Sequence, residues 1–384
     1  MFQNTYNIIK CNMKLMKLYI MIKKSNRQEI KNLAKELIFS SNGITRREIA
    51  DKTGLDVRTC SSYVDELLKQ GLICEKIPAL NSAGRPPSLY CLNSGKLLFL
   101  GIVLRTESIS SNLIDMDNNV VKESRESIGI EDESKLRVIN RIFDIIDDCI
   151  RAFPDKRTAG ICISVSRWLR PPLSFLDTFE EIAEIVFKRT GIAVFRELPI
   201  NTITYSIREE NNDVRNIVLF HPGKVIELGI MKNGIVPGNT LSLEHELSHT
   251  KAERSGELCY CGGNGCLEHY VTDAAVREML SSIETEENKG ILLEDGLERK
   301  LPGYRKLADK LSEYCCLAFE KLYKTYKPEI LSYTGLLPEI WEKAVGKFNK
   351  TGKIKVKFIC LGRVDTTYTA ALTASYKAVK DFIR

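Results

Sequence analysis

Side chains that can bind a transition metal are clustered in one segment, residues 244–270. The segment holds three of the four histidines and three closely spaced cysteines, Cys259, Cys261 and Cys266. The glycines among them, at 262, 263 and 265, permit a tight turn that brings the three thiolates to one point. Three thiolates and one imidazole are a usual ligand set of a closed, structural Zn²⁺ site. We therefore expect zinc to be bound by His249, Cys259, Cys261 and Cys266.

Two alternatives to this ligand set are open at the level of sequence. His245 and His269 are rival candidates for the fourth ligand, because they lie in the same segment. The three cysteines would be ordinary buried thiols if they only filled a core, but the neighbouring glycines have no use in core packing. The other nine of the twelve cysteines are scattered, for example at Cys60, Cys149 and Cys162, which argues against a disulfide framework.

The charge of the chain is divided unevenly along its length. The 384 residues carry +6 overall, but residues 1–94 hold 15 Lys and Arg against 8 Asp and Glu. Residues 95–384 hold 41 against 42, so all of the positive excess is N-terminal. A local basic excess indicates a polyanionic partner for that part, and double-stranded DNA is the obvious candidate.

Residues 27–94 have the pattern of a winged helix-turn-helix. Apolar residues at helical spacing predict a first helix over 27–41, and Thr45-Arg46-Arg47-Glu48 is a capping box for the second. Gly54 permits the turn before a third helix over 57–70. In this arrangement the third helix enters the major groove of DNA.

A hairpin with a stiff tip follows these helices. Residues 71–75 and 88–92 have the pattern of its two strands, with Gly-Arg-Pro-Pro at 84–87 between them. Arg85 on this tip is placed to enter a minor groove or to hold a phosphate. Helix-turn-helix patterns also occur in packing modules, but the charge balance and the wing favour DNA binding.

The residues expected to contact DNA fall into two further groups. The candidates for reading base edges lie near the exposed start of the third helix and are Arg58, Thr59, Ser61 and Ser62. Arg46 and Arg47, at the start of the second helix, are expected to contact phosphates, because most polar contacts to DNA go to its backbone.

From residue 95 onward, short apolar runs alternate with helical patterns, which is typical of an α/β fold. Strands are predicted over 98–104, 109–115, 119–122, 159–165, 216–221, 225–231 and 356–361. Helices are predicted over 138–150, 304–326 and 365–383. The repeated theme predicts two lobes, residues 95–200 and residues 201–384, with the C-terminal helix as a candidate to return to the first lobe.

The N-terminal stretch at 15–22 is apolar but is interrupted by Lys17 and is too short to span a bilayer. Residues 1–26 are interpreted either as a disordered basic arm or as an over-extended start. We expect a soluble, cytoplasmic protein with reduced thiols and no membrane partner.

The cysteine segment resembles the signature of the ROK family of sugar kinases and sugar-responsive repressors. That signature is E-x-G-H followed by C-x-C-G-x-x-G-C-x-E, and it is matched at 246–249, with Ser248 in place of Gly, and at 259–268. The winged helix ahead of it is similar to the repressor branch, of the xylose and N-acetylglucosamine repressor type. The resemblance implies a two-lobed, actin-like (ribonuclease H-like) sugar kinase fold.

The resemblance also implies roles for two carboxylates beside the zinc ligands. Glu246, His249 and Glu268 match groups that hydrogen-bond sugar hydroxyls. A zinc-bound histidine has its ring fixed by the metal, so its other nitrogen meets a hydroxyl with little loss of entropy. The alternative for both glutamates is that they are ordinary surface acids.

The groups that phosphoryl transfer requires are missing at the matching positions. Kinases of the family carry an Asn-Asp-x-Asn run whose Asp is the base, and here Leu198 and Pro199 replace the first two residues. The first phosphate loop, D-x-G-G-T, is matched by Val-Leu-Arg-Thr-Glu at 103–107. The second, Gly-rich loop is matched at 223–229 with Val225 and Glu227, and residues 166–169 replace a Pro-Gly-Pro turn. We therefore expect no kinase activity.

Together these features predict a zinc-containing transcriptional regulator of ROK type, in its narrower form a repressor. It would bind a palindromic operator in double-stranded DNA as a homodimer or homotetramer, with a sugar or sugar phosphate as effector. Two alternatives are a sugar kinase with an accessory DNA-binding domain and a ligand-independent regulator whose sugar cleft has decayed.

Overall fold

The computed structural model describes residues 33–35, 37–38, 41, 43–76, 87–105, 107–127, 135–165, 176–211, 213–237, 240–335, 338–350, 356–361 and 364–383. Three predicted features lie wholly outside the described residues: the arm over 1–26, Arg85 at the wing tip and the loop at 166–169. The predicted first helix over 27–41 is described only at 33–35, 37–38 and 41. None of the helices within the described part of the chain is both long enough and apolar enough to cross a bilayer.

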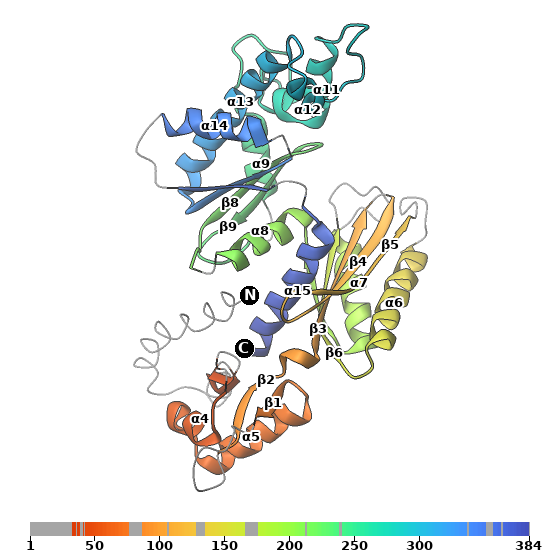
Figure 1. The fold of residues 1–384 in the computed structure, drawn as a ribbon, viewed down its shortest axis with the longest axis vertical. Helices are drawn as coiled ribbons and strands as arrows, with labels where there is room; N and C mark the ends of the chain where they lie inside the picture. The colour runs from red at the N-terminus through yellow and green to blue at the C-terminus, as the bar shows by residue number, and fades with distance from the viewer. Residues whose placement is uncertain are drawn as a thin grey trace. The chain divides into compact units, whose positions relative to one another are not determined.

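The second helix of the helix-turn-helix, α4 (Arg46–Thr53), is fixed at both ends by its own sequence (Figure 1). At its start the Thr45 hydroxyl accepts from the Glu48 amide at 3.1 Å, and the Glu48 carboxylate accepts from the Thr45 amide at 2.8 Å. This is the predicted capping box. At its end Gly54 has φ 72°, a left-handed conformation in which glycine avoids the strain of a Cβ atom.

The third helix, α5 (Val57–Lys69), begins at the side chain of Asp56, whose Oδ1 accepts from the Thr59 amide at 2.9 Å. Its inner face is apolar and buried, through Cys60, Tyr63, Val64 and Leu67. These residues pack with Ala34, Ile38, Ile44 and Ile49 into the core of the domain. The opposite face of α5 is thereby left to solvent.

The wing is an antiparallel pair, β1 (Ile73–Lys76) and β2 (Leu89–Leu92). On the other side of β2, Tyr90 exchanges both backbone hydrogen bonds with Ile44, at 2.8 and 3.0 Å. The wing is therefore tied to the segment that leads into α4. The short helix η2 (Ser94–Lys96) connects it to the rest of the chain.

The next body is a five-stranded mixed sheet of order β5-β4-β3-β6-β7. Its strands are β3 (Leu97–Arg105), β4 (Ser108–Asp115), β5 (Val120–Ser127), β6 (Arg157–Val165) and β7 (Ala193–Glu197). Three helices accompany it, α6 (Lys135–Ala152), α7 (Leu176–Thr190) and the C-terminal α15 (Thr366–Ile383). β3 pairs antiparallel with β4 and parallel with β6, so it is the central strand.

Alternate residues of β3 enter two different cores, because successive side chains of a strand point to opposite faces. Leu98 and Leu100 pack with α6, whereas Phe99 and Val103 pack with the alanine-rich face of α15. Figure 1 shows α6 and α15 on opposite faces of the sheet. At Gly101 an added Cβ would lie 2.3 Å from the backbone nitrogen of Ala371, so only glycine allows this approach of helix and strand.

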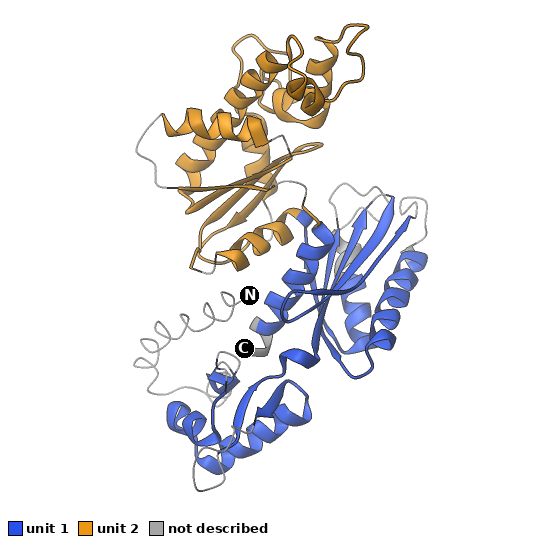
Figure 2. Cartoon of the chain, viewed as in Figure 1, with its two compact units in different colours: residues 1–199, 366–384 blue, residues 200–365 orange. Residues whose placement is uncertain are grey.

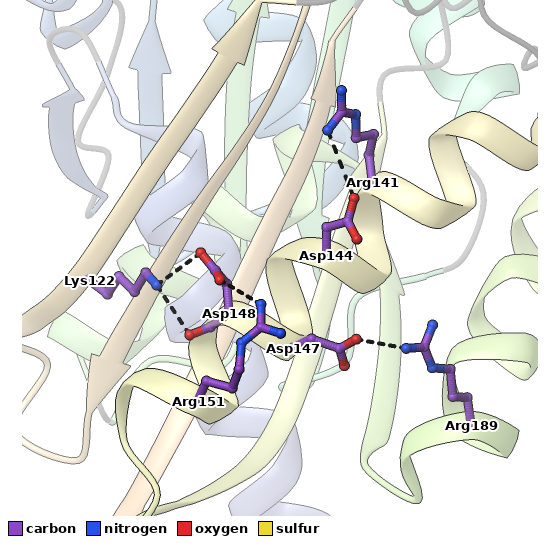
Figure 3. Close-up of polar contacts among 7 residues, drawn as sticks. All are labelled: Lys122, Arg141, Asp144, Asp147, Asp148, Arg151 and Arg189. Atoms are coloured by element: carbon purple, nitrogen blue, oxygen red, sulfur yellow. Dashed lines mark hydrogen bonds and ion pairs between the residues drawn. The ribbon is translucent and has the colours of Figure 1, made fainter.

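Ion pairs on the outer surface of α6 join it to neighbouring elements (Figure 3). Asp148 contacts Lys122 of β5 at 3.4 Å and Arg151 at 2.9 Å, and Asp147 contacts Arg189 of α7 at 2.7 Å. These side chains are largely exposed, so each pair contributes little to stability. The acids of this surface are held in ion pairs across α6, β5 and α7.

A second sheet of order β11-β10-β8-β9 organises the other half of the chain. Its strands are β8 (Ile217–Pro222), β9 (Ile226–Met231), β10 (Ile330–Thr334) and β11 (Lys357–Leu361). The helices around it are α8 (Pro199–Glu210), α9 (Leu241–Ser248), α10 (Glu268–Val271), α11 (Asp273–Ser281), α12 (Leu293–Glu298), α13 (Tyr304–Tyr326) and α14 (Pro338–Asn349). Its core is rich in aromatic rings, with Phe319 in edge contact with Phe220, Tyr333 and Trp341.

The chain divides into two compact units (Figure 2). One comprises residues 1–199 and 366–384, and the other comprises residues 200–365. The first contains the winged helix, the five-stranded sheet and α15. The second contains the four-stranded sheet and the cysteine segment. The architecture is α/β with an N-terminal winged helix-turn-helix and two sheets, as the sequence predicted.

Candidate functional site

The cysteine segment follows α9 and is shaped by two left-handed glycines. The Cys259 amide donates to the Gly263 carbonyl at 2.7 Å and the Gly262 amide donates to the Cys259 carbonyl at 2.9 Å, which closes a tight turn. Gly262 has φ 84° and Gly265 has φ 68°. At Gly265 an added Cβ would lie 2.1 Å from the Glu253 carbonyl oxygen, so no larger residue fits. This turn places the cysteine side chains on one side of the loop.

One ligand atom from each of His249, Cys259, Cys261 and Cys266 lies within 4.8 Å of all the others. His249 Nδ1 is 3.4 Å from Cys259 Sγ, and Cys261 Sγ is 3.6 Å from Cys266 Sγ. A tetrahedral zinc with bonds of about 2.3 Å to sulfur and 2.0–2.1 Å to nitrogen has edges of about 3.6 and 3.8 Å. The four donors therefore fit a metal such as zinc in number, type and spacing.

The donors of the cluster differ in how readily they lose a proton in the metal-free protein. Burial, together with the neighbouring sulfurs, raises the pKa of Cys266 to about 12 in the metal-free protein. The amide of Gly263 donates to Cys261 and lowers the pKa of that thiol, and burial lowers the pKa of His249. A divalent cation stabilises thiolates, so it would remove the cost of ionising Cys266.

The two rival histidines have other surroundings. The His245 ring lies against the His249 ring, with centroids 4.3 Å apart, and His269 Nδ1 lies 3.8 Å from a Glu257 carboxylate oxygen. Among the described residues, the four-membered donor cluster contains His249 and neither of these.

Tyr260, between the first two cysteines, is a member of the site that sequence reasoning missed. Its hydroxyl lies 3.1 Å from His249 Nε2 and donates to Glu268 Oε2 at 3.4 Å. With Nδ1 of His249 turned to the sulfurs, the protonated Nε2 donates to the Tyr260 oxygen. This makes a relay from carboxylate to phenol to imidazole of the kind that orients metal ligands. Its only sequence signal is the aromatic type at the variable position of Cys-x-Cys.

The two predicted sugar-binding carboxylates do not behave alike. Glu268, at the start of α10, is half-buried and joins His249 through Tyr260. Glu246 is exposed on α9, and its Oε1 pairs with Lys321 of α13 at 2.8 Å. The structure thus brings Glu268 to the histidine and turns Glu246 toward α13.

Residues at the positions that match kinase loops take part in helices or contact other residues of the same chain. Pro199 is the first residue of α8, a position that suits its fixed φ and missing amide proton. Glu197, two residues earlier, pairs with Lys377 of α15. Arg105, in the first phosphate-loop match, donates to Ser110 and Thr366 hydroxyls at 2.5 Å each.

The start of α5 presents polar side chains at the surface. Arg58 and Ser62 are exposed, whereas Thr59 and Ser61 are half-buried. The Thr59 hydroxyl donates to Asp56 at 2.5 Å and so takes part in the helix cap. Arg58 and Ser62 are therefore the better placed of the four for base edges.

The two arginines of α4 are used differently. Arg46 donates from Nε to the Tyr90 hydroxyl at 2.9 Å and from Nη2 to Asp65 at 2.5 Å. It thereby connects α4 to the wing and to α5. Arg47 is exposed on the same helix.

Comparison with known proteins gives matches to both halves of the chain. The ROK family model matches residues 169–319, and a winged helix-turn-helix DNA-binding model matches residues 21–73. A putative xylose repressor from Caldicellulosiruptor sp. (strain Rt8B.4) is 26% identical over 290 residues, which cover 71% of this chain and 70% of that protein.

Two solved structures show the same fold at low identity. A ROK family transcriptional regulator, described as a homologue of the Escherichia coli MLC protein, aligns with a TM-score of 0.72 and 17% identity over 93% of this chain and 98% of that one. A ROK hexokinase from Thermus thermophilus aligns with a TM-score of 0.58 and 19% identity over 74% of this chain and 99% of that one. Both regulators and kinases are thus structural neighbours.

Proposed function

Because this chain belongs to the ROK family and carries an N-terminal winged helix-turn-helix, we propose that it is a transcriptional repressor whose affinity for DNA is set by a sugar or sugar derivative. It acts at an operator in double-stranded DNA, in the cytoplasm. A roughly palindromic operator bound by a homodimer or homotetramer follows from the usual symmetry of such proteins.

The proposal rests on the combination of an exposed helix start at α5 with a sugar-kinase-like fold that has a proline at the position matching the catalytic base. Arg58 and Ser62 are free of the apolar core at the start of α5, where a recognition helix contacts bases. Pro199 stands where the family resemblance places the base, and proline cannot accept a proton. The fold is thus retained without the group that would deprotonate a sugar hydroxyl, which favours binding over phosphoryl transfer.

The sugar site is proposed at Glu268 and His249, with Glu246 as a further contact. The relay through Tyr260 supports this location, because the phenol already makes with His249 and Glu268 the bonds that a sugar hydroxyl would make. Glu246 can join once its exposed ion pair with Lys321 opens, at low cost. Xylose and related repressors among the relatives support the choice of ligand class.

The metal is proposed to be zinc in a structural role. All four donors come from the protein, so a filled tetrahedron leaves no open position for a substrate. Bound zinc would hold the cysteine turn together and fix the His249 ring, while Tyr260 and Glu268 orient that ring from outside.

DNA binding is tested by mapping bound DNA across the genome and measuring affinity for the recovered site. Arg58→Ala should weaken binding by about 1–3 kcal/mol and relax preference at one base position. Exposed Lys69 at the far end of α5 provides a control, Lys69→Ala, that should leave base preference unchanged. Absence of any enriched site with a normally folded protein would overturn the proposal.

Effector control is tested by thermal shift against a panel of sugars and sugar phosphates. A ligand that binds only the native state raises the melting temperature, and it should also change the affinity for the recovered operator. No shift with any member would leave a ligand-independent regulator. Phosphate transfer from labelled ATP to a sugar would overturn the non-enzymatic part of the proposal.

A further inference from the structure

The wing of the DNA-binding domain contains two free cysteines that directly face each other. Cys74 of β1 and Cys91 of β2 are partners in the register of the hairpin, and their sulfur atoms lie 3.5 Å apart. Both are free thiols, with Cys74 half-buried and Cys91 3% exposed. This contact lies in the first unit, whereas the metal-binding cysteines lie in the second.

We propose that Cys74 and Cys91 form a reversible disulfide that weakens DNA binding, so that the wing is a redox-sensitive modification site. The regulatory half of this inference rests on the proposed function, because it requires a protein that binds DNA. The disulfide itself does not depend on that function.

The position of the pair in the ladder makes such a bond strained and therefore reducible. Tyr90 directs both of its backbone groups to Ile44, so those of the next residue, Cys91, face β1. Cys74 and Cys91 thus occupy a hydrogen-bonded position, where Cα atoms are about 5.5 Å apart, within the range of disulfides. Cβ atoms at such positions are also near 5.5 Å apart, whereas a disulfide needs about 3.8 Å. Closing the bond must pull the strands together, and strained disulfides are the labile ones.

The strain would reach the helices that contact DNA through the neighbour of Cys91. Tyr90 exchanges two backbone bonds with Ile44, just ahead of α4, and its hydroxyl accepts from Arg46. Arg46 in turn pairs with Asp65 of α5. A shift of β2 is therefore transmitted to both helices of the reading motif, and it also redirects the wing.

The oxidation requires a two-electron oxidant, and a peroxide is sufficient. The Cys74 thiolate, the more exposed of the two, attacks a peroxide oxygen; the O–O bond breaks, water leaves and Cys74 becomes a sulfenic acid. Cys91 sulfur then attacks the Cys74 sulfur, the S–O bond breaks and a second water leaves. Two thiols have lost two electrons and two protons, and hydrogen peroxide has become two waters. Burial raises the pKa of the Cys74 thiol, so at neutral pH the reaction needs excess oxidant.

The test uses the full-length, metal-loaded protein treated with hydrogen peroxide. Non-reducing tryptic mapping should recover residues 70–76 linked to residues 77–96, and dithiothreitol should separate them. Binding to a fluorescent duplex of about 30 base pairs, three helical turns, should weaken about tenfold on oxidation and recover on reduction. Zinc content measured in the same samples distinguishes this effect from damage to the metal-binding cysteines.

Two variants isolate the pair. Cys74→Ser and Cys91→Ala should bind the duplex like the reduced protein and lose the response to peroxide. If the buried substitution Cys91→Ala prevents folding, the result with Cys74→Ser is sufficient. Oxidation of other cysteines without the linked peptide would overturn the proposal, as would a linked protein with unchanged affinity. A reduced protein that binds no duplex would overturn the proposed function and the proposed control of DNA binding. The peptide map would still show whether the disulfide forms.

Discussion

The hydroxyl of Tyr260 lies 3.1 Å from Nε2 of His249, on the side of the ring opposite the nitrogen that faces the cysteine sulfurs. The same hydroxyl reaches Glu268, so a carboxylate, a phenol and the imidazole that we propose as a metal ligand form one line of hydrogen bonds. This relationship gives Tyr260 two consequences. It orients the ring that we propose as a metal ligand, and it occupies the position that we propose for a sugar hydroxyl.

Replacing Tyr260 by phenylalanine should weaken metal binding without abolishing it. The ring and its contact with His249 are kept, but Nε2 loses its partner, and losing such an outer partner typically costs 10–100-fold in metal affinity. Competition with a chelator would measure this change, and we expect about tenfold. Tyr326→Phe on α13 is the matched control. Equal zinc affinity in the two variants would contradict the orienting role.

Replacing Cys261 by serine should abolish stoichiometric zinc binding. Serine keeps the size of the side chain but removes the thiolate, so three donors remain around the ion. Elemental analysis should fall from about one zinc per chain to near zero, with a lower melting temperature. Cys360→Ser, at an exposed cysteine in the same unit, should keep both. Unchanged zinc in Cys261→Ser would refute the ligand set.

Sequence predicted the features whose causes are local. All four candidate metal ligands lie within 18 positions, and the caps at Thr45 and Asp56 lie beside the helices that they begin. Pattern alone therefore predicted the cysteine cluster and the helices α4 and α5. Contacts between distant elements could not be read in this way. Arg46 meets Tyr90, 44 positions away, and was predicted only as a phosphate contact.

The same limit applies to the predicted sugar-site carboxylates and to the contacts of the C-terminal helix, whose return to the first lobe is predicted but whose partner residues are not. Glu246 carries the family motif, but its ion pair with Lys321 depends on how α9 packs on α13. Arg105 and Thr366 are 261 positions apart and hydrogen-bonded, because α15 lies on β3. Such partners are chosen by tertiary packing, and a single sequence carries no periodic signal for them.

Substitutions of Arg46 and Arg47 should have different effects, the first on the stability of the fold and the second on DNA binding. Arg46→Ala removes the bonds to Tyr90 and Asp65, and we expect a loss of about 1–2 kcal/mol in the free energy of unfolding. Arg47→Ala should change stability by less than about 0.5 kcal/mol, because the side chain is exposed. It should instead weaken DNA binding and reduce the slope of log affinity against log salt concentration by about one, as expected for the loss of one phosphate contact. Denaturant titration and binding at several salt concentrations measure the two effects. A loss of stability in Arg47→Ala together with none in Arg46→Ala would contradict the structure.

Acid should weaken the start of α4 through Glu48. The amide of Thr45 donates to this carboxylate and lowers its pKa from the ordinary 4.5. A lowered pKa in the folded state contributes stability above the unfolded value, and this contribution is lost as pH falls through the folded value. In Glu48→Gln the amide hydrogens of α4 should therefore exchange about twofold faster than in the wild type at pH 7, and this difference, measured by mass spectrometry, should disappear once acid protonates Glu48 in the folded wild type. Exposed Asp51, replaced by Asn, is the control. A difference that persists in acid would contradict the role of the charge.

The contact between β3 and α15 should be sensitive to a single methyl group. An added Cβ at Gly101 would lie 2.3 Å from Ala371 N and 2.6 Å from Thr367 O, both backbone atoms of one helix. No rotamer change relieves such a clash, so helix and strand must separate. Gly101→Ala should cost about 3 kcal/mol and lower the melting temperature by roughly 5–10 °C. Gly95→Ala, where nothing lies within 4 Å of the added atom, should melt like the wild type. If the two variants have the same melting temperature, α15 does not approach β3 this closely.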